Sequence, residues 1–300
     1  MTGVSLLITG HSSLVTRILE GAMELTCTSF SFPLLKFADA AKVIAILGIA
    51  NLDVGAHEGG AHIQPSRVEA DPVGEAEAIK RAVGTAGLGV SDFFPTFGEG
   101  FRGRPVNTPN AAEREANQGR FRAIVQVARA IGAKGITLLP GVVFDEIGPD
   151  RSFDLSVAEL RRLVPIAHDA GLRLSVECHL ESVAERPARA LQLIQAVPGL
   201  QLTLDYSHFL ANDFTSEDVH PLIPHAGHFH ARQAKPFFLQ ADGRTGTLNF
   251  IDIVHRLKGA GYPGDLCLEY TWQEWRIANN VDVLSETVLL REQLLRAWQE

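Results

Sequence analysis

The chain has 300 residues, of which 46% are hydrophobic and 21% are charged, and these values are ordinary for a soluble globular protein. Its formal net charge of −8 argues against a nucleic-acid-binding surface, because such surfaces carry a basic patch. No apolar run reaches the roughly 20 residues that a membrane-spanning helix needs, so we expect no membrane association.

The regular pattern of the chain begins at Met23. Residues 1–22 contain an apolar stretch, but no basic segment precedes it and no clear cleavage site follows, so a signal peptide is not expected. We interpret 1–22 as an N-terminal appendage, either disordered or the product of a start codon assigned too early. The domain is predicted to occupy residues 23–300.

Strand-like and helix-like segments alternate from Met23 to the end of the chain, which indicates a parallel sheet with helical crossovers. Eight strands are predicted, over residues 23–28, 51–56, 88–94, 135–139, 173–178, 201–205, 226–230 and 265–269. Eight βα units predict a single (β/α)8 barrel, which typically needs about 250 residues. No linker divides the chain into two domains.

Three connecting helices have boundaries that can be read from the sequence. One is predicted over residues 110–131, and another over 249–258, where glycines follow. A third is predicted to open at Ser156, since Ser156 and Glu159 form a capping-box pattern, and to end near Gly171. The irregular stretch 94–110, rich in proline, glycine and arginine, is predicted to be a loop over the barrel mouth.

The three cysteines, Cys27, Cys178 and Cys267, each fall in a strand-like segment. An odd number of cysteines at such positions is typical of buried thiols in a reducing compartment, not of a disulfide framework. We therefore expect a cytoplasmic protein.

The last four strands each end on a candidate metal ligand, and these are Glu177, Asp205, His230 and Glu269. Side chains alternate along a strand, so each candidate shares a face with a residue two positions earlier: Ser175, Thr203, His228 and Cys267. Leucine and valine dominate the opposite faces. A polar face beside an apolar one suits a barrel strand covered by helices, so the four side chains are predicted to converge at the carboxyl ends of the strands, where such barrels place active sites.

Several neighbouring residues are further candidates. His57 ends the second strand on the same face as Asp53, which predicts an inward-facing site residue. His208 follows Asp205 by three positions and is either a substrate ligand or a turn residue; Arg232 follows His230 by two and is either an oxygen clamp or a surface salt-bridge residue.

Four more side chains lie close to these motifs. His228 is interpreted as a packed residue behind His230. Trp272 and Trp275 wall the pocket or fill a subunit interface, which leaves a homo-oligomer open. Arg232, Lys235 and Arg244 would suit an anionic group, but are equally typical of a solvated surface.

Four motifs in this order resemble the xylose isomerase-like barrels, a superfamily of sugar isomerases and epimerases that also includes the nucleases of AP endonuclease family 2. They are V-E-C-H at Glu177, L-D-Y-S-H at Asp205 to His208, H-F-H-A-R at His228 to Arg232, and G-Y-P-G-D-L-C-L-E at Gly261 to Glu269. The resemblance implies one divalent ion held by Glu177, Asp205, His230 and Glu269. This oxygen-rich set favours Mn²⁺, with Mg²⁺, Co²⁺ or Zn²⁺ as alternatives.

The resemblance also implies an activity. It is that of an isomerase or epimerase of a sugar, sugar phosphate or keto-sugar, working by proton transfer through a metal-bound enediolate. Glu177 and Glu269 match the two catalytic glutamates, and His208, Arg232 and His57 are the expected contacts of a small carbohydrate-like substrate.

Departures from the family pattern weigh against two related chemistries. The stretch Ala231–Lys235 lacks the acids of a second metal site, which favours proton transfer over a hydride shift. Asp242-Gly243-Arg244 has arginine where the tri-zinc nucleases need histidine, so a nuclease is disfavoured. A dehydratase of keto-cyclitol or dehydroshikimate type would use the same site and stays open. The intact ligand set argues against a non-catalytic binding barrel.

Overall fold

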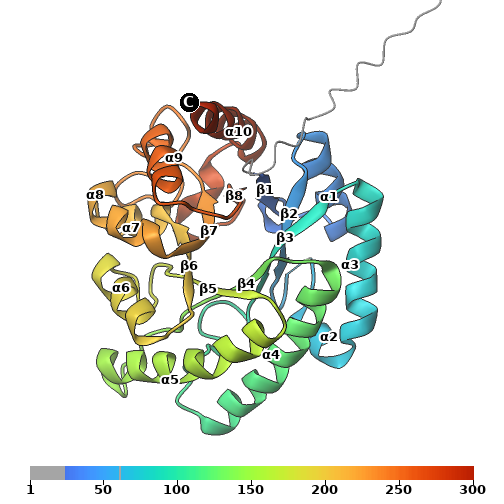
Figure 1. Ribbon diagram of the computed structural model, residues 1–300, viewed down its shortest axis with the longest axis vertical. Coiled ribbons are helices and arrows are strands. Elements are labelled where there is room, and N and C mark those ends of the chain that lie inside the picture. The colour runs from blue at the N-terminus through green and yellow to red at the C-terminus, as the bar shows by residue number, and fades with distance from the viewer. Residues whose placement is uncertain (1–23, 61) are drawn as a thin grey trace, which may run out of the picture.

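The structure is a computed structural model that describes residues 24–60 and 62–300. The interpretation of residues 1–22 as an appendage lies outside this range. Figure 1 shows a ring of strands surrounded by helices.

Eight parallel strands form a closed barrel in chain order, from β1 next to β2 through to β8, which pairs back with β1. The strands are β1 (Leu25–Thr28), β2 (Asn51–Ala56), β3 (Gly89–Pro95), β4 (Gly135–Leu138), β5 (Arg173–Glu177), β6 (Gln201–Asp205), β7 (Ala226–Ala231) and β8 (Leu266–Leu268). The predicted (β/α)8 barrel is confirmed, and each predicted strand lies within two residues of the observed bounds.

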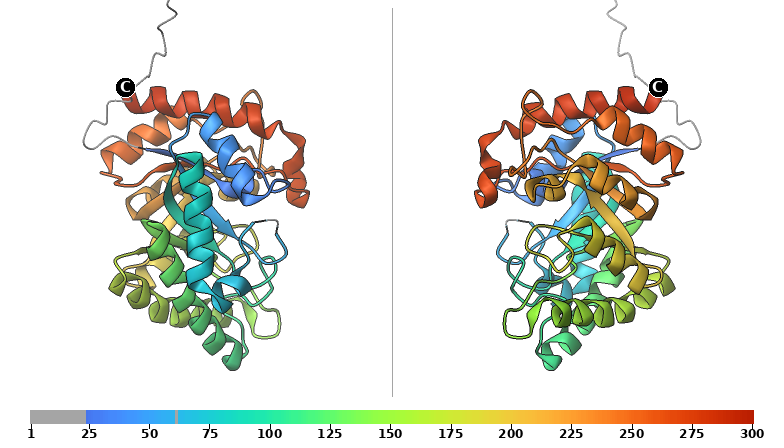
Figure 2. Two further views of the ribbon diagram at one scale, coloured as in Figure 1. Left: turned by 90° about the vertical axis from the view of Figure 1, so that its right-hand side faces the viewer. Right: turned by 90° about the vertical axis from the view of Figure 1, so that its left-hand side faces the viewer.

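Helices connect successive strands on the outside of the barrel (Figure 1). They are α1 (Phe37–Ile46), α2 (Pro65–Ala70), α3 (Pro72–Ala86), α4 (Ala111–Ile131), α5 (Gly148–Asp169), α6 (Pro187–Ala196), α7 (Tyr206–Ala211), α8 (Ser216–Val219), α9 (Phe250–Gly259) and α10 (Val283–Gln299), with short 3₁₀ segments η1 (Ser29–Ser31), η2 (His220–His225) and η3 (Trp275–Asn280). In Figure 2, α10 lies alongside α9 at one edge of the molecule.

Side-chain caps fix the starts of two predicted helices. The Asn110 carboxamide accepts hydrogen bonds from the backbone N–H groups of Ala112 (3.0 Å) and Glu113 (3.4 Å), and α4 begins at the next residue. The Asn249 carboxamide caps α9 in the same way, through the N–H of Asp252 (3.2 Å). Both helices therefore lie where the sequence predicts them.

The predicted start of α5 is wrong. The helix begins at Gly148, so Ser156 lies inside it, buried, and its hydroxyl donates to the carbonyl of Ser152 (3.4 Å). Pro149 lies in the first turn, where proline is favoured because no N–H is needed there. Glu159 is paired with Arg114 of α4 (3.0 Å), so the Ser-x-x-Glu pattern serves helix packing and not capping.

The two faces of the barrel strands differ as the alternation predicts. Outward-facing Leu174, Val176 and Leu204 are buried beneath the helices. Inside the barrel, the Thr137 hydroxyl lies 2.6 Å from both Asp92 Oδ2 and the Thr203 hydroxyl. Below the carboxyl ends of the strands, the interior is therefore a hydrogen-bonded polar layer, unlike the branched apolar side chains that usually fill such barrels.

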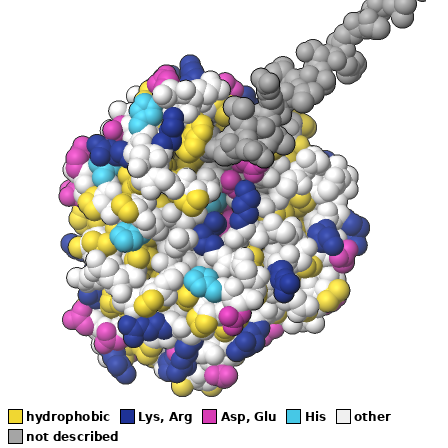
Figure 3. All heavy atoms as spheres, in the orientation of Figure 1, with side chains coloured by type: hydrophobic (Ala, Val, Ile, Leu, Met, Phe, Trp, Pro, Cys, Tyr) yellow, Lys and Arg dark blue, Asp and Glu magenta, His cyan; other side chains and the backbone are white. Residues whose placement is uncertain are grey.

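The predicted burial of all three cysteines is confirmed, and all three are free thiols. Within the described chain, no helix combines the length and apolar character needed to cross a bilayer. Figure 3 shows basic and acidic side chains interspersed over one face of the molecule.

Candidate metal and active site

The four predicted ligands lie at the carboxyl ends of neighbouring strands. Glu177 ends β5, Asp205 ends β6, His230 is the fifth residue of β7, and Glu269 follows β8 directly. All four side chains are almost completely buried. Asp205 also caps α7, because its Oδ1 accepts a hydrogen bond from the N–H of Ser207 (2.8 Å). Strand ends and a helix start thus hold the acids in place.

Three of these side chains converge on one point. Nδ1 of His230 lies 2.6 Å from Glu177 Oε1 and 2.8 Å from Glu269 Oε2. One ring nitrogen can donate a single proton, so it can satisfy only one of two carboxylates at this distance. Glu269 Oε2 is buried without a hydrogen-bond partner among the described residues. Two carboxylates and an imidazole in this arrangement fit a hard divalent cation.

Asp205 belongs to an adjoining group of donor atoms. Its Oδ2 accepts a hydrogen bond from Arg232 Nη2 (2.7 Å) and lies 3.8 Å from His208 Nε2, which is 3.7 Å from Glu177 Oε2. Nη1 of Arg232 lies 3.6 Å from Glu269 Oε1. The guanidinium thus neutralises two of the predicted ligands in this structure, and Asp205 is joined to the others through Glu177.

Burial and charge pull the pKa values of the site in opposite directions. Burial opposes charge on His230, but the carboxylates of Glu269, Asp53 and Glu177 outweigh it and raise the pKa of the imidazole well above its ordinary value. Burial also opposes ionisation of Glu177, yet the neighbouring imidazoles of His208 and His230 lower its pKa well below the ordinary value. For Glu269 burial prevails over Arg232 and His230, and its pKa is raised.

Behind His230 lies a residue that the sequence analysis did not assign to the site. Asp53, on β2, has its Oδ2 2.6 Å from His228 Nε2 and 3.5 Å from His230 Nε2, and its Oδ1 accepts a hydrogen bond from the Thr26 hydroxyl (3.1 Å). A carboxylate in this position orients a ligating imidazole. The sequence did contain a signal for Asp53, because the alternation along the predicted strand places it on the same face as His57.

The acids open into a cavity of about 260 Å³. Its polar lining includes Glu177, His208, Arg232, Glu269 and His57. Its aromatic lining consists of Phe30, Phe94, Phe101, Trp272 and Trp275. Trp272 and Trp275 therefore wall this cavity. The remaining two basic candidates do not line it: Lys235 packs on Phe238, and Arg244 lines a separate hollow.

His57 lies among aromatic rings. Its ring centroid is 5.2 Å from that of Phe30 and 5.6 Å from that of Phe94, both in edge contacts. Burial, with a smaller contribution from His62, lowers the pKa of His57 to about 4. At neutral pH the side chain is therefore an uncharged imidazole facing the cavity.

Segments far apart in the chain meet over the cavity. Phe101, from the predicted loop 94–110, has its ring 5.1 Å from that of Trp275 and 4.1 Å from that of His179. Arg276 forms an ion pair with Glu181 (2.9 Å) next to this contact. The loop, the segment after β5 and the segment after β8 thus restrict access of water to the acids. Sequence patterns gave no signal for these contacts, since none repeats with strand or helix spacing.

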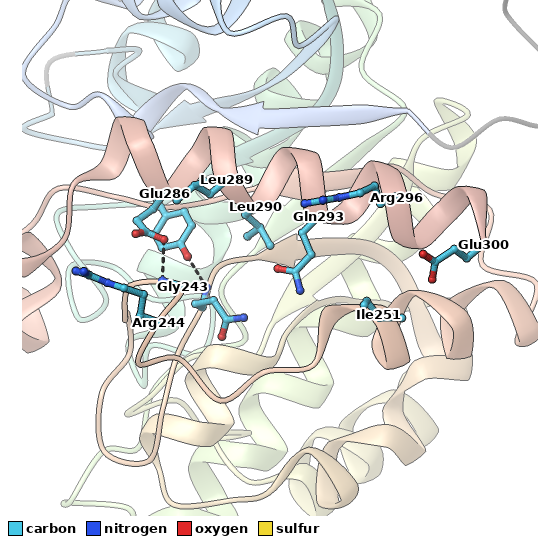
Figure 4. Close-up of a pocket in the computed structure, with 11 residues that line it drawn as sticks. Gly243, Arg244, Ile251, Glu286, Leu289, Leu290, Gln293, Arg296 and Glu300 are labelled. Carbon is cyan, nitrogen blue, oxygen red and sulfur yellow. Dashed lines mark hydrogen bonds between the residues drawn. The ribbon is translucent and has the colours of Figure 1, made fainter.

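A larger hollow of about 730 Å³ lies on the outside of the barrel (Figure 4). Leu289, Leu290 and Gln293 of α10 line it opposite Ile251 of α9, and Glu286 accepts a hydrogen bond from the N–H of Gly243 (2.8 Å). It shares no described lining residue with the cavity above the acids. Of the two hollows, the smaller cavity is the one lined by the predicted ligands Glu177 and Glu269.

Comparisons with known proteins agree with this architecture. Residues 23–293 match the family profile described as xylose isomerase-like TIM barrel. No curated protein sequence matches the chain.

Solved structures with the same fold include three that are informative. A xylose isomerase-like TIM barrel protein from Mycobacterium smegmatis in complex with magnesium is 16% identical, with a TM-score of 0.70 over 92% of this chain and 96% of that one. A D-psicose 3-epimerase crystallised with D-fructose is 14% identical (TM-score 0.71, 93% and 100%). The probable 3-DHS dehydratase of petrobactin synthesis from Bacillus anthracis is 12% identical (0.65, 90% and 99%). At these identities the likeness is one of fold.

Proposed function

The chain belongs to the xylose isomerase-like TIM barrel family, and from this premise we propose that it is a divalent-metal-dependent isomerase or epimerase of a carbohydrate-like substrate. The observation that carries the proposal is the convergence of Glu177 and Glu269, which line the cavity, on the imidazole of His230. Solved neighbours of the same fold include a sugar epimerase and a magnesium complex, which supports this reading.

Glu177, Asp205, His230 and Glu269 would hold one divalent ion, with Mn²⁺ as the first candidate. When bound there, such an ion stabilises negative charge that develops on substrate oxygens as a proton leaves carbon. Arg232 would orient Asp205, because its Nη2 donates a hydrogen bond to Asp205 Oδ2 (2.7 Å).

The two glutamates would move the proton. They come from β5 and β8, with two strands between them, and both line the cavity, so a substrate between them meets a carboxylate from each strand end. One carboxylate takes the proton from the carbon next to the carbonyl, which leaves an enediolate. The other returns a proton to the opposite face or to the neighbouring carbon.

His208 and Arg232 would hold the substrate oxygens. The N–H of Leu180 donates to His208 Nδ1 (3.3 Å) and Arg232 Nη2 lies 3.1 Å from His208 Nε2, so the backbone and the guanidinium hold the imidazole in place beside Glu177 and Asp205. His57 presents a neutral ring on the same cavity and would pack or hydrogen-bond with the sugar.

A dehydratase is the second candidate. It would also remove a proton next to a carbonyl and would then expel hydroxide, so the same residues would serve it. The structural similarity to a probable dehydratase of the same fold supports this second candidate.

Turnover in D₂O tests the proposal and separates the candidates. The metal-loaded protein is incubated with D-fructose and related ketoses, and the products are examined by mass spectrometry and proton NMR. Proton transfer through a carboxylate places deuterium on the carbon next to the carbonyl. An unlabelled product would indicate a hydride shift and contradict the proposal, and a labelled product that lacks one water would identify the dehydratase.

A further inference from the structure

The cavity above the acids adjoins a second hollow on the protein surface. This hollow, which we call the rim groove, has a volume of about 350 Å³ and is lined by residues 31–35 and 281–284 together with Trp272. Pro33 and Trp272 line both hollows. The two hollows are therefore neighbours on either side of these residues.

The rim groove exposes large apolar side chains. Leu34 is 77% exposed, Leu284 48%, Trp272 40% and Leu35 37%. Leu34 and Leu35 come from the turn after η1, and Leu284 from the first turn of α10, so two distant segments form one apolar surface beside the site. A contiguous exposed patch of this kind marks a binding surface, unlike scattered exposed leucines.

The charge of the rim groove restricts what it can bind. Asp282 is the one ionisable residue among its described lining residues. Its carboxylate caps α10, accepting hydrogen bonds from the N–H (3.1 Å) and the hydroxyl (2.6 Å) of Ser285. The described lining of the groove thus carries no positive charge for a phosphate, and its one carboxylate is engaged at the start of α10, so a neutral and apolar occupant fits best.

We infer that the rim groove is a subsite for a neutral apolar substituent, such as an aryl or alkyl group, carried by the substrate at the end remote from its carbonyl. The inference rests on the proposed function, because the carbonyl end must lie over Glu177 and Glu269. The adjacency of the two hollows at Pro33 and Trp272 favours a substituent of the substrate over a separate partner, since one molecule would then occupy both.

A matched pair of ketoses tests the inference. D-fructose and 6-O-benzyl-D-fructose share the carbonyl and its neighbouring hydroxyls and differ in the apolar group. Binding of each to the Mn²⁺-loaded full chain is measured by calorimetry. We expect the benzyl ether to bind at least about tenfold more tightly, because transfer of its phenyl ring from water into the apolar groove is favourable.

Leucine variants test whether the tighter binding of the benzyl ether comes from the rim groove. Leu34→Ser with Leu284→Ser should remove the preference for the benzyl ether and leave binding of D-fructose unchanged, because neither residue lines the inner cavity. Leu289→Ser is the matched control, since Leu289 is a 59% exposed leucine of the same helix that faces the hollow of Figure 4. It should retain the full preference.

The outcomes separate this inference from the proposed function. Equal binding of the two ketoses, or a preference that survives Leu34→Ser/Leu284→Ser, would overturn the rim-groove inference alone. Failure of both ketoses to bind would overturn the sugar chemistry and the inference together. A dimer that dissociates in the double variant, with the benzyl preference unchanged, would assign the groove to a second copy of the chain and would also overturn the inference.

Discussion

Glu177 and Glu269 carry the proposed chemistry at the residue scale, and their carboxylates can be removed without loss of shape. Glu177→Gln and Glu269→Gln should each lower turnover by roughly 10²–10⁴-fold or more, because each change removes a proton carrier and a ligand charge. Circular dichroism should show an unchanged fold. Glu115→Gln, at an exposed position of α4, is the control and should retain full activity. Near-wild-type rates in both site variants would show that the acid–base assignment is wrong.

Asp53 is expected to act on the metal through His230 and not on the substrate. Asp53→Asn keeps the size of the side chain but removes the charge that faces His228 and His230. The affinity for Mn²⁺, measured by calorimetry, should fall about 10–100-fold, as is usual when the partner of a ligating histidine is lost. An unchanged affinity would mean that Asp53 serves only the packing of the barrel interior.

His57 gives a prediction about stability and pH. Its pKa is lowered to about 4 in the folded chain, so in acid the unfolded chain binds this proton first. The stability contributed by the neutral ring is present above about pH 6.5 and is lost as the pH falls from there towards 4. By pH 5 the loss should reach about 2 kcal/mol. His57→Phe cannot titrate, so urea unfolding at pH 7 and pH 5 should show a smaller loss in the variant; equal losses would contradict the assignment.

At the scale of single elements, α5 contains a residue that lowers the stability of the helix. Pro165 lies in its interior, at an exposed position, where proline cannot donate the helical hydrogen bond. Pro165→Ala should raise the free energy of unfolding by about 1 to 2 kcal/mol, the helix gain being offset partly by a freer unfolded chain. Pro72→Ala, at the first position of α3, should give no such gain, because no N–H is needed there. Chemical denaturation measures both.

The elements also show what the sequence could predict and what it could not. Strand positions were predictable because period-two alternation survives in every strand, and Glu177 and Asp205 lie where that alternation ends. The start of α5 was not predictable, because a Ser-x-x-Glu pattern looks the same whether its residues cap a helix or lie between two packed helices. The contact of Arg232 with Asp205 depends on the register between β6 and β7, and that of Phe101 with Trp275 on loops, so neither has a local signal.

For the whole molecule, metal binding should be visible as stability. The chain should bind about one divalent ion, and Mn²⁺ at about 100 times its dissociation constant should raise the free energy of unfolding by about 2.7 kcal/mol. Differential scanning calorimetry with and without a chelator measures the change. Elemental analysis that finds three zinc ions per chain would contradict the one-metal site and favour the nuclease.

The hydrogen-bonded layer inside the barrel constrains how this protein can change over generations. Thr137 donates to Asp92, and the hydroxyls of Thr137 and Thr203 are hydrogen-bonded to each other, so replacing any one of the three by an apolar residue leaves a buried polar partner unsatisfied and costs about 1 to 3 kcal/mol. Replacing interacting partners together by apolar groups of similar shape is close to neutral. Related sequences should therefore differ at these positions jointly. Residues on the helical exterior should instead vary independently of one another.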